Sequence, residues 1–98
     1  MAKKLWSVFT KDMTHCYFTG TPCCHRHHIF YGPYRKKSEL YGFIIPIAYY
    51  LHEHEKDSVH ENPNHGLDLQ LKQMAQRYWE DHYGTREEFI QTFGKNRL

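Results

Sequence analysis

The sequence predicts a small α+β protein in which two strands come first and helices fill the last third of the chain. Ninety-eight residues provide enough chain for one folded domain. The composition, 40% hydrophobic and 24% charged, excludes a disordered or collagen-like chain, and the 16% aromatic fraction supplies large side chains for a core. Helical spacing of apolar residues occurs only in the last third, so the strands are assigned to the first half.

Two short apolar segments are expected to form the strands. Arg26 to Phe30 forms the first strand, which ends at the Gly32-Pro33 turn, and Gly42 to Ile47 forms the second. The loop between them is expected to carry the basic run Arg35-Lys36-Lys37.

The first C-terminal helix is indicated by an apolar stripe at helical spacing, formed by Leu67, Leu71, Met74, Ala75 and Tyr78. Asn62-Pro63 suits the start of this helix and Gly84 suits its end. Trp79 falls beside the stripe, either covering the core or exposed.

A second, shorter helix is expected after Thr85, because Thr85 and Glu88 have the spacing of a capping box. Its apolar residues are Phe89, Ile90 and Phe93. It ends at Gly94, and the basic segment 95–97 after it either contacts phosphate or frays.

The chain is expected to be one domain over residues 1–98, with a lead-in at 1–12, a strand region at 13–62 and helices at 63–98. Its longest apolar run, Tyr41 to Leu51, reaches only about half of a membrane span, and no signal-peptide core is recognisable. We therefore expect a cytoplasmic protein with no membrane partner.

Nine histidines, about four times ordinary usage, are the strongest indication of chemistry. The densest cluster contains His27 and His28, whose side chains point to opposite sides of an extended backbone and serve one site only where the strand ends or twists. Neutral imidazole is a common transition-metal ligand and suits a general base at neutral pH. A second group, which includes His52 and His60 among acidic residues, can converge with the first on one ion. His54 and the isolated histidines, His15, His65 and His82, are expected at the surface.

Several of these segments resemble the HNH endonucleases of the ββα-metal fold, which carry His-Ile at the end of the first strand. The closer similarity is to small phage proteins related to the phage recombination-enhancement nuclease. The matching segments, in order along the chain, are Cys16-Tyr17-Phe18-Thr19-Gly20, His25 to Phe30 with Gly32, Lys36-Lys37-Ser38-Glu39 with Gly42, Val59-His60-Glu61-Asn62 and Phe93-Gly94-Lys95-Asn96-Arg97-Leu98.

The resemblance implies a ββα-metal core with added C-terminal helices, and cleavage of DNA phosphodiester bonds that depends on one divalent ion, magnesium, manganese, zinc or nickel. By position, His28 would be the general base and His27 a metal ligand together with His52. His60 would be a further ligand or a phosphate contact. The basic run at Arg35, Lys36 and Lys37 would hold the DNA backbone, or would be a solvated turn.

The chain departs from the family in two places. Tyr34 stands where many members place an Asn that orients the base, and Cys16 lacks the partners of a four-Cys zinc site. Cys23 and Cys24 are read either as residues at the start of the strand or as metal ligands. An endonuclease or nickase of phage recombination or DNA processing, partnered by a recombinase filament or another recombination protein, is therefore the first hypothesis. A non-catalytic DNA-binding accessory protein that retains the HNH fold and a metal-stabilised structural protein are the alternatives.

Overall fold

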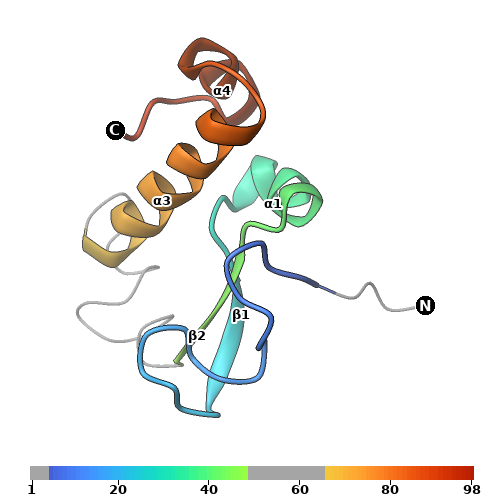
Figure 1. The fold of residues 1–98 in the computed structure, drawn as a ribbon, viewed down its shortest axis with the longest axis vertical. Helices are drawn as coiled ribbons and strands as arrows, with labels where there is room; N and C mark the ends of the chain where they lie inside the picture. Colours follow the sequence, from blue (N-terminus) through green and yellow to red (C-terminus); the bar gives the residue numbers. More distant parts are fainter. Residues whose placement is uncertain (1–4, 49–65) are drawn as a thin grey trace.

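The computed structural model describes residues 5–48 and 66–98 (Figure 1). These residues form, in order, strand β1 (Cys24–His28), the 3-10 turn η1 (Gly32–Tyr34), helix α1 (Arg35–Tyr41), strand β2 (Ile44–Ala48), helix α3 (Gly66–His82) and helix α4 (Arg86–Phe93). The α+β class predicted from the sequence is confirmed.

The two strands form an antiparallel pair whose register runs from Cys24 opposite Ala48 to His28 opposite Ile44. The N-terminal segment lies along the far side of β2, where the backbone N–H of Tyr17 donates to the carbonyl of Pro46 at 2.7 Å. Proline has no N–H to donate to a neighbouring strand. Pro46 is tolerated in β2 because the N-terminal segment bonds only to its carbonyl. Every residue of β2 is buried.

Both strands lie two residues from their predicted starts. β1 begins at Cys24 and not at Arg26, and β2 begins at Ile44 and not at Gly42. Phe30 leaves the ladder because its N–H donates to the Ser38 hydroxyl, and Gly42 ends α1 in the left-handed conformation, with φ of 73°. The end of β1 and the start of β2 are therefore both set by α1.

Helix α1 replaces the predicted loop between the strands. The basic run occupies the first turn of this helix, so its assignment to a loop was wrong. The 3-10 turn, which contains Pro33, precedes the helix and Gly42 ends it, so the seven residues between are free of helix-breaking types.

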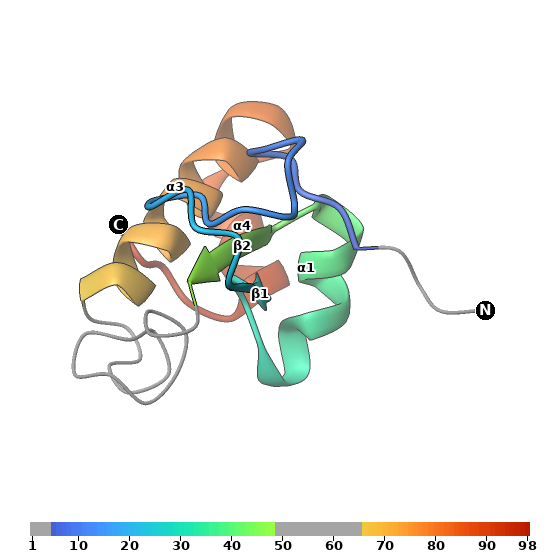
Figure 2. The same ribbon diagram turned by 90° about the horizontal axis from the view of Figure 1, so that it is seen from below.

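Helices α3 and α4 pack against the hairpin and against each other, as two views at right angles show (Figures 1 and 2). The predicted stripe faces the core: Leu71 and Ala75 are buried, and Leu67, Met74 and Tyr78 pack against the buried cluster. Trp79 belongs to this cluster, at 4% exposure. No helix in the described part of the chain is long and apolar enough to cross a membrane.

Helix α4 begins with the predicted capping box. Thr85 accepts from the N–H of Glu88, and the Glu88 side chain accepts from the N–H of Thr85 at 3.0 Å. The helix ends at Phe93, followed by Gly94 with φ of 86°. Gly84 was expected to end α3 in the same way, but α3 ends at His82 and Gly84 does not have a positive φ.

Candidate functional site

A histidine–carboxylate pair lies at the end of β1. His28 is the last residue of the strand, and its Nε2 lies 3.1 Å from Oε2 of Glu39 on α1. Both side chains are largely buried, at 9% and 13% exposure. A carboxylate only accepts, so Nε2 of His28 is the donor in this bond. In many enzymes a buried carboxylate orients the histidine that acts as general base through a hydrogen bond of this kind.

The neighbouring Ser38 places Glu39 against His28. The Ser38 hydroxyl accepts from the N–H of Phe30 at 2.9 Å and donates to the carbonyl of Phe30 at 2.6 Å. These two bonds hold α1 on the segment that follows His28. The indole N–H of Trp6 adds a bond to the carbonyl of Glu39 at 3.1 Å. These bonds hold the backbone of α1 at Ser38 and Glu39 and so position the carboxylate.

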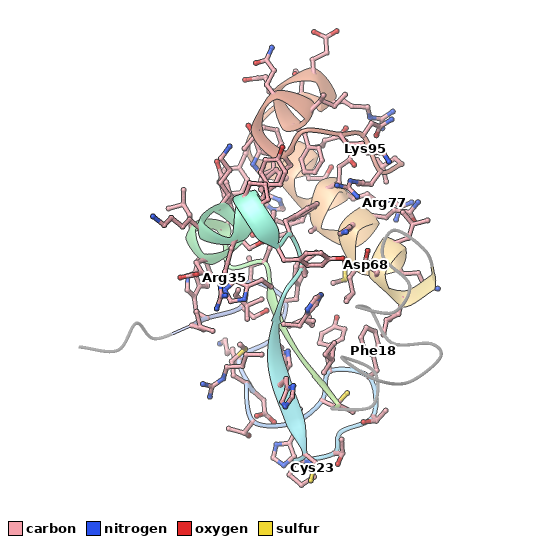
Figure 3. The ribbon with its side chains drawn as sticks, turned by 180° about the vertical axis from the view of Figure 1, so that it is seen from behind. Phe18, Cys23, Arg35, Asp68, Arg77 and Lys95 are labelled. Atoms are coloured by element: carbon pink, nitrogen blue, oxygen red, sulfur yellow. The ribbon has the colours of Figure 1, made fainter. Side chains whose placement is uncertain are left out.

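The three basic residues of α1 have different surroundings. Nε of Arg35 lies 3.9 Å from Oε2 of Glu39, and its side chain is 67% exposed (Figure 3). Lys36 is exposed to solvent. Lys37 donates to the carbonyl of Thr92 near the end of α4 at 2.6 Å, so it also stabilises the helix packing. Arg35 is the cation that the structure brings beside the histidine–carboxylate pair.

His27, the predicted metal ligand on β1, is 2% exposed, and its ring lies 5.8 Å from the ring of Tyr31. His27 and His28 thus contact different groups although they are adjacent. The other predicted ligands, His52 and His60, lie outside the described residues. Within residues 5–48 and 66–98 no three His, Cys, Asp or Glu side chains form a metal-binding group. An imidazole suits the predicted ion chemically, but the described residues do not complete a site for it.

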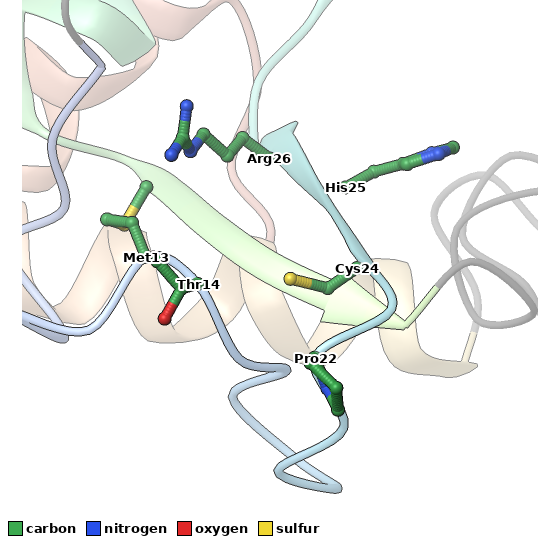
Figure 4. A pocket seen from close by; sticks show the side chains of 6 residues that line it. All are labelled: Met13, Thr14, Pro22, Cys24, His25 and Arg26. Carbon is green, nitrogen blue, oxygen red and sulfur yellow. The ribbon is translucent and has the colours of Figure 1, made fainter.

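A cleft of about 400 Å³ borders the start of β1 (Figure 4). Cys24 and Arg26 point toward Met13 and Thr14 on one side of the strand, whereas His25 points to the other side. Cys24 is the first residue of the strand, which matches its reading as a residue at the strand start, and all three thiols are free. Burial raises the pKa of the Cys24 thiol, which makes it a weak nucleophile.

Cys16 is different, because its sulfur accepts a hydrogen bond from the N–H of Thr19 at 3.4 Å. Burial acts to raise its pKa, but hydrogen bonds from Thr19, Phe18 and Ala48 outweigh this effect, and the pKa of the thiol is lowered.

Sequence reasoning missed Glu39 as the partner of His28 and missed a buried polar cluster near Tyr31. In that cluster Nζ of Lys72 lies 2.8 Å from Oδ2 of Asp68, and the Tyr31 hydroxyl donates to Oδ1 of Asp68 at 3.2 Å. The i, i+4 spacing of Asp68 and Lys72 was a usable signal for their pairing, but it did not indicate burial. Glu39 lies eleven residues from His28, and no local pattern connects them.

Comparison of the chain with models of known protein families, with curated proteins and with solved structures found no match.

Proposed function

We propose that this protein is a metal-dependent DNA endonuclease or nickase of the ββα-metal type, acting in the cytoplasm in phage recombination or DNA processing. The observation that carries the proposal is the buried bond between His28 and Glu39. The resemblance assigned the general base to His28 from sequence, and the structure gives that residue a carboxylate partner. Tyr34 stands in place of the family Asn, and Glu39 takes over the orienting role in this proposal.

In this mechanism His28 removes a proton from the water that attacks the phosphodiester. In this proposal Nδ1 takes the proton, because Nε2 donates to Glu39. The nearby carboxylate stabilises the imidazolium that forms, which makes Glu39 a positioning residue. Arg35, exposed and 3.9 Å from the same carboxylate, is placed to contact the DNA backbone. A divalent ion held by His27 with His52 and His60 would stabilise negative charge on the phosphate when bound.

The net charge of +2 is too small for tight binding to DNA without further contacts. We therefore propose that a recombinase filament or another recombination protein delivers the substrate. The second candidate function is a DNA-binding accessory protein that retains the fold without cleavage. It is favoured by the strand register, in which His27 and His28 both stay paired, opposite Ile45 and Ile44, and contact different groups.

A plasmid-nicking assay with magnesium, manganese, zinc, nickel or EDTA separates these functions. We expect His28→Ala to lower the rate of cleavage by about 10²–10⁴-fold, the usual effect of removing a general base. His15→Ala, at an exposed histidine outside the site, is the matched control and should cut like the wild type. Cleavage that persists in His28→Ala would refute the assignment of the base. DNA binding without cleavage under any metal would favour the accessory protein.

The role of Glu39 is tested by the variants Glu39→Gln and Glu39→Asp. Because Glu39 acts on His28 and not on DNA, Glu39→Gln should lower kcat by about tenfold or more with KM little changed. Glu39→Asp, which keeps a carboxylate, should recover part of the loss. If both Glu39 variants changed KM and stability to the same extent and left kcat unchanged, Glu39 would have only a structural role.

A further inference from the structure

A segment near the N-terminus closes the end of helix α1. The last carbonyls of an α-helix have no partner within the helix, and in the short α1 these include the carbonyl of Glu39. The indole N–H of Trp6 donates to this carbonyl at 3.1 Å. The backbone N–H of Val8 donates at 2.8 Å to the carbonyl of Gly42, the residue that follows the helix. Residues 6–9, the strap, therefore cross the end of α1 and bind it at two places.

The two ends of the strap are held differently. At its outer end the ring of Trp6 lies on Gly42, where a Cβ would come within 2.6 Å of the ring, yet the side chain is 47% exposed. At its inner end Phe9 packs against the core, because its ring stacks on Phe43 at 5.9 Å and meets the Tyr78 ring edge-on at 5.6 Å. The strap thus has an anchored inner end and a solvent-exposed outer end.

The carbonyl bound by the strap and the carboxylate bound by His28 belong to one residue. Glu39 accepts from Trp6 through its backbone and from His28 through its side chain, at 3.1 Å in each case. A helix as short as α1 is not stable without contacts to the rest of the protein. The position of Glu39 therefore depends on the bonds between Ser38 and Phe30 and on the strap.

We propose that the strap is a conformational switch for the pair of His28 and Glu39. Docked on α1, it holds the carboxylate against the imidazole, and when its outer end lifts, the pair loosens. In the described part of the chain the outer end is held by the bonds of Trp6 and Val8 and by one half-exposed ring, whereas the core beneath consists of buried side chains. The outer end can therefore open locally, about Phe9 as the hinge, while the core stays folded.

This switch makes Trp6 a positioning residue for the proposed nuclease. Only the effect of the strap on cleavage rests on that proposed function. The effect of the strap on the His28–Glu39 bond does not require the protein to cut DNA.

Nuclear magnetic resonance of the isotopically labelled full-length chain tests the switch without reference to cleavage. The ring N–H of His28 that donates to Glu39 is protected from exchange with water, and its exchange rate reports how often the pair opens. Trp6→Phe keeps a ring on Gly42 and removes the N–H, so it should raise this rate at least about threefold, the effect of losing one ordinary hydrogen bond. Trp6→Ala removes both contacts and should raise the rate further.

The matched control is Phe18→Ala. It removes an aromatic ring of similar exposure, 45%, that lies across the hairpin from Arg35 at the start of α1 (Figure 3). This variant should exchange at His28 like the wild type. Equal exchange rates in the wild type and both Trp6 variants, or a wild type without a protected ring N–H at His28, would overturn the proposal.

Urea below the unfolding transition separates local opening from global unfolding. Lifting the strap exposes little surface, so exchange at His28 should be nearly independent of urea, whereas exchange at the buried Ala75 in α3 should rise steeply with it. A steep dependence at His28 as well would overturn the switch, because the pair would then open only when the whole protein unfolds.

Cleavage kinetics test the consequence for the reaction. In a chain that nicks plasmid DNA, Trp6→Phe should lower kcat about threefold or more with KM little changed, because the strap acts on Glu39. Unchanged kcat in Trp6→Ala would overturn the role of the strap in the reaction. If the wild type does not cut DNA, the nuclease proposal fails and the exchange rates alone decide on the switch. The two proposals can therefore fail independently.

Discussion

The buried pair of Asp68 and Lys72 offers a stability test whose outcome depends on burial. The carboxylate and the ammonium are 2.8 Å apart, and their side chains are 0% and 5% exposed. Asp68→Asn removes the charge that the ammonium contacts in a site with little access to water. We expect the free energy of unfolding to fall by about 3–5 kcal/mol, as for other buried pairs that lose one partner.

This loss is large beside the roughly 5–15 kcal/mol that stabilises a typical domain, so the variant should remain folded but melt at lower temperature and urea concentration. Urea unfolding followed by circular dichroism measures it. The exposed pair of Arg86 and Glu80, 3.3 Å apart, is the control, and Arg86→Ala should cost less than about 1 kcal/mol.

A double variant separates the charge effect from packing. Asp68→Leu combined with Lys72→Met removes both charges and keeps apolar volume, so it should be about as stable as the wild type or more stable. A loss below about 1 kcal/mol in Asp68→Asn would refute the reasoning, because it would mean that water screens the pair as it does at a surface.

Three further predictions follow from single contacts. Burial and the Asp68 carboxylate raise the pKa of Tyr31 to about 12. The unfolded phenol loses its proton near pH 10, so the free energy of unfolding should fall as pH rises from 10 to 12. The tyrosinate absorbance of the wild type is compared with that of Tyr31→Phe, and the difference should show no ionisation of Tyr31 at pH 10–11. In Gly42→Ala, the left-handed backbone and a Cβ 2.6 Å from the Trp6 ring should cost about 1–3 kcal/mol in urea unfolding, and an unchanged midpoint would contradict this. Thr85→Ala removes the capping box and should cost about 1 kcal/mol, whereas Thr85→Ser should keep most of it.

Parts of the fold were predictable because their signals are local. The capping box at Thr85 satisfies backbone groups within four residues, and the apolar stripe of α3 repeats at the helical period. The Gly32-Pro33 turn likewise depends on the conformations of its own residues, and the structure places both in η1. The basic run at 35–37 was wrongly predicted to lie in a loop, because a charged segment between strands is typical of a loop as well as of an exposed helix.

The composition and local patterns by themselves determined the α+β class and the helices of the last third. Tertiary structure alone decided that Glu39 reaches His28, that Ser38 binds the backbone of Phe30, and that Gln76 binds the backbone of Arg97. Local signals come from backbone bonds and side-chain spacing within a few residues. Contacts between distant residues form only where packing of the core brings two elements together, and the sequence shows no spacing from which they can be read.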